Sequence, residues 1–165
     1  MQHYLTWNKG ILESSYQIFE TGKIKCTMFF DTWRSEAKAI SQKSTYLFKD
    51  DGLYATTTQL FNDKNELLGF ITYNDWKAKA TVTLNTGEKY NFEFTNTWFS
   101  EWTITNLADK EINYSSSTSS GQVSSNTDDE LMLLLGFYAR EHFTKMLILL
   151  VLIFAFIPII YRGVH

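Results

Sequence analysis

The stretch that decides the fold is DDELMLLLGFYAREHFTKMLILLVLIFAFIPIIY, residues 128–161, in which two apolar runs follow each other closely. Three acidic residues (128–130) precede the first run. Acidic side chains suit the start of a helix because they cap free N–H groups and face the positive end of the helix dipole. Charged residues separate the first run (131–139) from the second (146–161). The stretch therefore predicts two consecutive hydrophobic helical segments.

The residues upstream of this stretch have the pattern of short β-strands. In residues 77–84, apolar side chains at the even positions alternate with Lys and Thr at the odd positions. Such a period of two is typical of a strand with one buried face. About ten such runs follow each other at the spacing of hairpins, which favours an antiparallel meander or barrel. The last polar segment, residues 115–127, is rich in Ser, Thr and Asn and predicts a loop.

The first apolar run predicts a helix that is wrapped by the chain's own sheet. Residues 131–139 contain no polar position, so no face of this helix suits water. Nine residues rise only about 14 Å, too little to cross a bilayer core of about 30 Å. A meander that curls into a barrel around the helix (128–143) would bury it. The side chains predicted to form the helix part of the barrel core are Leu131, Leu134, Leu135 and Tyr138.

Strands over roughly residues 2–115, followed by Asp-Asp-Glu-Leu-Met-Leu-Leu-Leu-Gly-Phe-Tyr (128–138), resemble the tubby C-terminal-like superfamily. That group includes tubby proteins, phospholipid scramblases and LURP-one-related proteins, and the chain is most similar to small bacterial members. The resemblance covers roughly residues 2–143 and rests on pattern, without an invariant motif. It implies a closed antiparallel barrel of about twelve strands around a hydrophobic helix. The fold expected is therefore mainly β, a closed barrel of about 10–12 strands around a central α-helix.

The second apolar run, residues 146–161, predicts a transmembrane helix. Its sixteen residues carry no charge and span about 24 Å, near the low end of what a bilayer crossing needs. The alternative is that this run is the buried helix and residues 131–139 are its lead-in. The first interpretation gives a β domain (1–143) in the cytoplasm and a C-terminal single-pass membrane anchor (144–165). The side chains expected to face lipid are Met146, Leu150, Phe154, Pro158 and Tyr161.

Composition and motifs argue against several classes of function. The net charge is −3, and an acidic chain does not suit nucleic-acid binding, which needs clustered Lys and Arg. Three His residues lie far apart in the sequence, so no metal site is expected. No catalytic motif and no glycine-rich phosphate loop occur. We therefore expect neither an enzyme nor a cofactor.

Four lysines are candidates for contact with anionic lipid headgroups: Lys23, Lys25, Lys77 and Lys79. They lie on the outward faces of two predicted strands, where an ordinary solvated surface is the alternative. The function expected is a non-enzymatic, membrane-anchored tubby-like domain that binds lipid headgroups or organises partners at the cytoplasmic membrane surface. Two alternatives stay open. One is a protein-interaction module that engages an unknown partner through residues 115–127 or a strand edge, and the other is a scramblase-like lipid-transfer protein.

Overall fold

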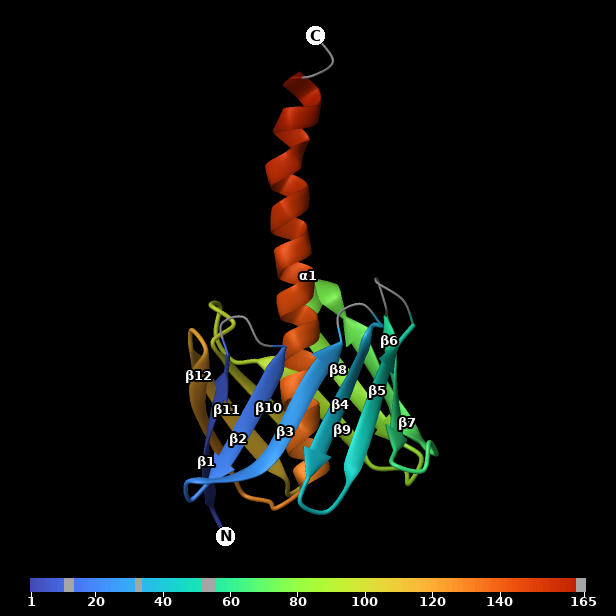
Figure 1. Ribbon diagram of the computed structural model, residues 1–165, viewed down its shortest axis with the longest axis vertical. Coiled ribbons are helices and arrows are strands. Elements are labelled where there is room, and N and C mark those ends of the chain that lie inside the picture. Colours follow the sequence, from blue (N-terminus) through green and yellow to red (C-terminus); the bar gives the residue numbers. More distant parts are fainter. Residues whose placement is uncertain (11–13, 32–33, 52–55, 163–165) are drawn as a thin grey trace.

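In the part of the chain that the structure describes, twelve antiparallel strands form a barrel around one long helix (Figure 1). The computed structural model describes residues 1–165 except 11–13, 32–33, 52–55 and 163–165, and it describes no side chains for 158–162. The elements are β1 (His3–Lys9), β2 (Ser15–Glu20), β3 (Lys23–Asp31), β4 (Glu36–Ser41), β5 (Thr45–Asp50), β6 (Thr57–Asn62), β7 (Leu67–Asn74), the 3-10 helix η1 (Asp75–Lys77), β8 (Lys79–Leu84), β9 (Lys89–Phe94), β10 (Glu101–Thr105), β11 (Glu111–Ser117), β12 (Ser120–Ser125) and α1 (Glu130–Arg162).

The sheet closes because its last strand pairs with its first. Each strand lies next to its neighbours in the sequence, and β12 pairs with both β11 and β1, for example through Val123 opposite Leu5. All twelve strands therefore have partners on both sides. The predicted β-barrel is confirmed.

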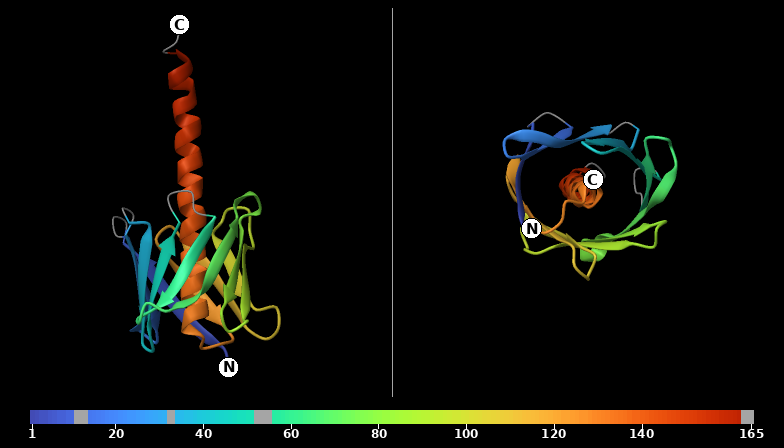
Figure 2. Two further views of the ribbon diagram at one scale, coloured as in Figure 1. Left: turned by 90° about the vertical axis from the view of Figure 1, so that its right-hand side faces the viewer. Right: turned by 90° about the horizontal axis from the view of Figure 1, so that it is seen from below.

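The core lies between the inward faces of the strands and the first third of α1, which runs along the inside of the ring (Figure 2). Leu134, Leu135 and Tyr138 are buried there, and Leu131 is partly buried. Tyr138 stacks on Phe48, with 4.3 Å between ring centroids. An all-apolar helix segment has no stable place in water, so wrapping it on every side gives the barrel its core.

The acidic residues before the first apolar run do start the helix. The Asp129 carboxylate accepts a hydrogen bond from the Met132 N–H at 3.0 Å, the geometry of a helix N-cap. We call the end of the barrel where α1 begins the base, and the end from which α1 leaves the mouth.

The loop predicted over residues 115–127 is wrong, because this segment contains the end of β11 and all of β12. Its Ser and Gly residues have weak strand propensity, yet backbone pairing on both sides holds β12 in place. Gly121 is required by close packing: a Cβ there would lie 1.8 Å from the Ser115 carbonyl oxygen and 2.7 Å from Trp7 Nε1. The small residues are thus what lets β12 fit.

The transmembrane helix predicted over residues 146–161 is also wrong. The two apolar runs belong to one continuous helix, α1, and within the described residues no helix is both long enough and apolar enough to cross a membrane. Any eighteen consecutive residues taken from 130–157 include Arg140, Glu141 and Lys145. The predicted single-pass anchor (144–165), and the membrane localisation inferred from it, are therefore not supported.

Of the residues assigned to that anchor, Met146, Leu150 and Phe154 lie on α1; Leu150 and Phe154 are exposed and Met146 is partly buried. The side chains of Pro158 and Tyr161 lie outside the described residues.

Candidate functional site

The part of α1 beyond the mouth, residues 146–157, is apolar and exposed; we call it the stem (Figures 1 and 2). Nine of its twelve residues carry large apolar side chains that are 44–68% exposed. At about 100° per residue, these nine leave no sector around the helix axis wider than about 60° without an apolar side chain. They are Leu147, Ile148, Leu150, Val151, Leu152, Ile153, Phe154, Phe156 and Ile157. The stem therefore presents no face suited to water.

Exposed aromatic side chains lie at the barrel mouth, in the connections β7–β8 and β9–β10. Trp76 in η1 is fully exposed, and Trp98 in the β9–β10 loop is 86% exposed. Both connections lie at the mouth, because β7 and β9 run from the base toward it. Phe99, next to Trp98, is also exposed, and its ring packs edge-on against Phe94 at 4.7 Å. Aromatic rings are thus presented next to an apolar helix at one end of the barrel.

A crevice of about 180 Å³ lies between the stem and this aromatic rim. One wall belongs to α1 and the other to the strands and connections at the mouth. The apolar side chains that line it are Ala78, Phe94, Phe99, Phe143, Met146, Leu147 and Leu150.

Contacts at His142 hold α1 in place where it leaves the barrel. The His142 ring stacks on Tyr73, with 3.5 Å between centroids, and Nε2 lies 3.0 Å from Asp75 Oδ1. Phe143, the next residue, packs edge-on against Tyr73. These contacts join α1 to β7 and η1, so they position the stem relative to Trp76 and the crevice.

The charged residues between the two apolar runs have partners inside the barrel near its mouth. Lys9 Nζ lies 2.8 Å from both carboxylate oxygens of Glu141, and the Tyr16 hydroxyl donates to Oε2 at 2.7 Å. Burial raises the pKa of Glu141, but the charge of Lys9 and the hydrogen bonds outweigh it, so the pKa is lowered. Arg140 Nη1 donates to the Tyr16 oxygen, and its guanidinium packs 4.9 Å from the Trp102 ring centroid. This network keeps charged residues within a continuous helix.

The structure does not bring the four candidate lysines together. Lys23 and Lys25 lie on β3 near the base, whereas Lys77 and Lys79 lie at the mouth, and strands β4 to β7 separate the two pairs. Lys25 is buried and pairs with Glu20 and Asp128, and Lys79 pairs with Glu93. Only Lys23 and Lys77 of the four are without an ion pair among the described residues. A single headgroup patch built from these lysines is absent from the described surface.

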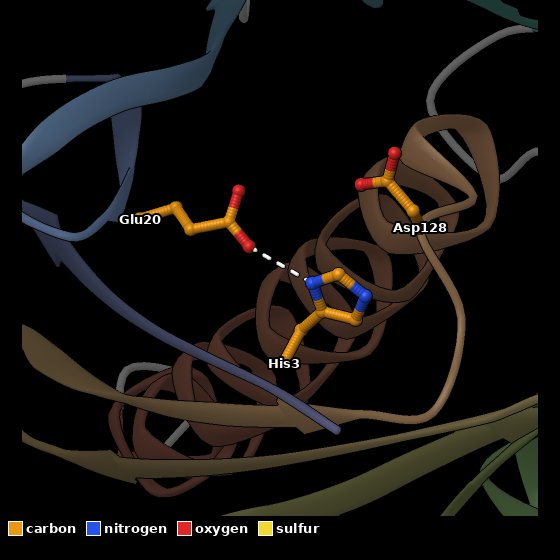
Figure 3. A group of neighbouring side chains, drawn as sticks. All are labelled: His3, Glu20 and Asp128. Atoms are coloured by element: carbon orange, nitrogen blue, oxygen red, sulfur yellow. Dashed lines mark hydrogen bonds and ion pairs between the residues drawn. The ribbon is translucent and has the colours of Figure 1, made fainter. Parts of the chain in front are cut away.

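At the base, His3, Glu20 and Asp128 form a cluster whose ligand atoms lie within 4.8 Å of one another. Figure 3 shows the three side chains converging from β1, β2 and the segment before α1. However, Lys25 Nζ lies 2.7 Å from Glu20 and 2.6 Å from Asp128, and Lys43 Nζ lies 2.9 Å from Asp128, so two ammonium groups already balance the two carboxylates. Hydrogen bonds from Lys25 and Lys43 lower the pKa of Asp128 to about 2. The arrangement suits an ion-pair network better than a metal ion.

A second, larger depression of about 510 Å³ lies on the outer wall, across β10, β11, β12 and β1. Most side chains that line it from outside are small and uncharged, such as Ser115, Gln122 and Ser124, and Glu101 is the acidic one. None of its lining residues belongs to the stem. No group of buried polar side chains converges on it in the described structure.

No family model, no curated protein and no solved structure matches this chain. The resemblance to the tubby C-terminal-like superfamily therefore stays a prediction from the residue pattern. The function is therefore inferred from the geometry of the mouth and the stem. The sequence predicted the apolar character of the stem. It did not predict that Trp76 and Trp98 lie at the mouth, because a strand pattern does not tell at which end of a barrel a connection lies.

Proposed function

We propose that this chain is a non-enzymatic lipid-binding module that inserts its stem, from the barrel mouth, into the near leaflet of a lipid surface. The observation that supports this proposal is the exposure of apolar side chains on every side of residues 146–157. Exposed apolar surface of this extent marks a site of interaction with protein or membrane.

Lipid suits the stem better than a protein groove does. A helix bound in a groove buries one face, which is formed by residues at positions i, i+3, i+4 and i+7, and its other faces stay in water. Fluid hydrocarbon surrounds all faces at once. The twelve residues of the stem rise about 18 Å, comparable with the roughly 15 Å of hydrocarbon in one leaflet.

The foot of the stem has the residue types that favour the lipid headgroup region. Trp76 and Trp98 are exposed there, and Trp is enriched where hydrocarbon meets water because its ring is apolar and its N–H is polar. Lys145, exposed at the foot, makes no ion pair within 4 Å among the described residues; its Nζ lies 5.1 Å from the Phe30 ring centroid, and its charge helps to lower the pKa of Glu141. Its long side chain can reach lipid phosphates while the helix lies in hydrocarbon.

The protein-interaction alternative loses the two features on which it depended. Residues 120–125 are the barrel strand β12, and the twelve described strands are paired on both sides, so within the described part of the chain no strand edge is free to add a peptide strand. No feature of the described residues favours the lipid-transfer alternative.

Flotation of the full-length chain with neutral phosphatidylcholine vesicles tests the proposal. A triple variant, Ile148→Asp with Val151→Asp and Phe154→Asp, should weaken binding by more than about a hundredfold, since each Asp costs about 2.5–3.5 kcal/mol in hydrocarbon. The control is Leu107→Asp, because Leu107 is exposed in the connection at the base and should leave binding unchanged. A wild-type chain that does not float, or a triple variant that floats equally well, would overturn the proposal.

A second binding measurement tests whether Lys145 contacts anionic lipid headgroups. Lys145→Ala should weaken binding to vesicles containing phosphatidylserine about fivefold at low salt, since one lysine contributes about 1 kcal/mol near an anionic surface. It should leave binding to neutral vesicles unchanged. An equal loss on both kinds of vesicle would mean that Lys145 acts through packing and not through charge.

A further inference from the structure

We infer that the crevice at the foot of the stem binds the end of a single hydrocarbon chain, such as a lipid acyl chain. The inference rests on the proposed function, because an acyl chain would reach the crevice from the hydrocarbon around the stem. It adds a defined binding site to what would otherwise be insertion without selectivity.

The shape and lining of the crevice fit a hydrocarbon occupant. Its volume is about 180 Å³, and a cavity of about 150 Å³ lined by Leu, Ile and Phe stays dry and binds benzene. A segment of about six carbon atoms therefore fits. Phe94 packs against Phe99 and, at 5.9 Å between centroids, against Phe143, so the aromatic wall is held by its own edge-to-face contacts.

The polar groups of the lining are already satisfied. Asp75 is the only charged side chain that lines the crevice in the described structure, and it pairs with His142 at 3.0 Å. The Thr144 hydroxyl donates to the Arg140 carbonyl oxygen at 2.9 Å. An anionic ligand would meet the Asp75 carboxylate without any positive partner in the lining, and it would lose its hydration. An uncharged apolar chain is the occupant that matches this lining.

The position of the crevice favours a chain that arrives from lipid. Leu147 and Leu150 line the crevice and are also exposed on the stem, so the apolar surface is continuous from one to the other. A chain that lies along the stem can enter without crossing water. The contacts of His142 with Tyr73 and Asp75 fix the position of α1 relative to the opposite wall of the crevice.

The test uses a variant that should no longer insert its stem into lipid but keeps the crevice. The full-length triple variant of residues 148, 151 and 154 retains every lining residue of the crevice. It is titrated with monomeric 8-bromo-1-octanol, and quenching of tryptophan fluorescence is followed. We expect saturable quenching in this variant.

Two further substitutions in the triple variant provide a matched comparison. Leu147 and Leu152 are both 48% exposed, but only Leu147 lines the crevice. Leu147→Phe should abolish saturable quenching by filling the crevice, whereas Leu152→Phe should leave it unchanged. Circular dichroism shows whether both variants are folded.

The outcomes are distinct. The inference is overturned if the triple variant shows no saturable quenching, or if the Leu147→Phe and Leu152→Phe variants are quenched equally. Either result leaves the proposed function intact, because flotation with vesicles can still succeed. Failure of flotation with saturable quenching retained overturns the proposed function instead. Dimers that dissociate on addition of the probe would show that a second copy fills the crevice, and would also overturn the inference.

Discussion

Gly136 allows α1 to lie close to the barrel wall. A Cβ at this position would lie 2.3 Å from the Tyr114 hydroxyl oxygen and 2.5 Å from its Cζ. Tyr114 is buried, stacks on Trp102 and donates its hydroxyl to the Leu133 carbonyl oxygen at 3.0 Å. A residue larger than glycine would therefore push α1 away from β11 or break this contact.

Gly136→Ala should lower the free energy of unfolding by about 2 kcal/mol, because overpacking a rigid core outweighs the better helix propensity of alanine. Urea unfolding followed by tryptophan fluorescence measures the change. Gly87→Ala is the control: nothing lies within 4 Å of the added methyl, and only its backbone angle φ of +91° opposes the change. Unchanged stability in Gly136→Ala would show that helix and wall are further apart than described.

Glu141 and Lys9 form an ion pair that is largely withdrawn from water, with side chains 10% and 25% exposed. Glu141→Gln should lower the free energy of unfolding by about 2–3 kcal/mol, because Lys9 then keeps its charge without a carboxylate partner. Lys9→Met combined with Glu141→Leu should cost less than the sum of the two single changes. Strict additivity in this double-mutant cycle would mean that the pair does not interact.

At the scale of elements, β12 closes the barrel although Val123 is its only large apolar residue. Its place depends on the close approach of Gly121 to Ser115 and Trp7. A strand with little apolar surface of its own is stable here because both neighbours supply hydrogen bonds and burial.

Gly121→Leu should prevent closure, because the new side chain would overlap the β11 backbone. We expect loss of cooperative unfolding and rapid proteolysis of the C-terminal part of the barrel. Gln122→Leu, at the next and exposed position, should remain folded. Limited proteolysis and near-UV circular dichroism distinguish the two variants, and a cooperative Gly121→Leu protein would contradict the close approach.

At the scale of the whole molecule, the base is tied together by charges from distant segments. Asp128, just before α1, pairs with Lys25 on β3 and with Lys43 in the β4–β5 turn. Lys25 also pairs with Glu20 on β2. The helix start is thereby attached to three places on the wall.

This network predicts a loss of stability in acid. The pKa of Asp128 is lowered from 3.8 to about 2 in the folded chain, so the native state binds fewer protons than the unfolded state between these values. Its contribution is present above about pH 4 and is lost as the pH falls toward 2. The stability difference between wild type and Asp128→Asn should therefore shrink over this interval.

Urea unfolding from pH 6 to pH 2 measures that difference. Asp63→Asn provides the baseline, because Asp63 is exposed in a turn and makes no ion pair among the described residues. A wild-type minus Asp128→Asn difference that stays constant down to pH 2 would contradict the ion pairs.

Local patterns predicted much of the barrel and little of the candidate site. The alternation over residues 77–84 predicted β8, since a period of two follows from the pleat of a single strand. The all-apolar run predicted the wrapped helix. The stem was recognised as apolar but assigned to a transmembrane span, because the charges of Arg140, Glu141 and Lys145 were read as a break between two helices and not as part of one.

The order of residues alone determined the strands with clear alternation, the capped start of α1 and its apolar character, because each depends on neighbours a few positions away. Only the tertiary structure decided that β12 closes the barrel, that Lys9 neutralises Glu141 from 132 positions away, and that Trp76 and Trp98 lie at the same end of the barrel as the stem. The physical reason is that these features are contacts between segments far apart in the chain, and such contacts exist only once the sheet has closed around its helix.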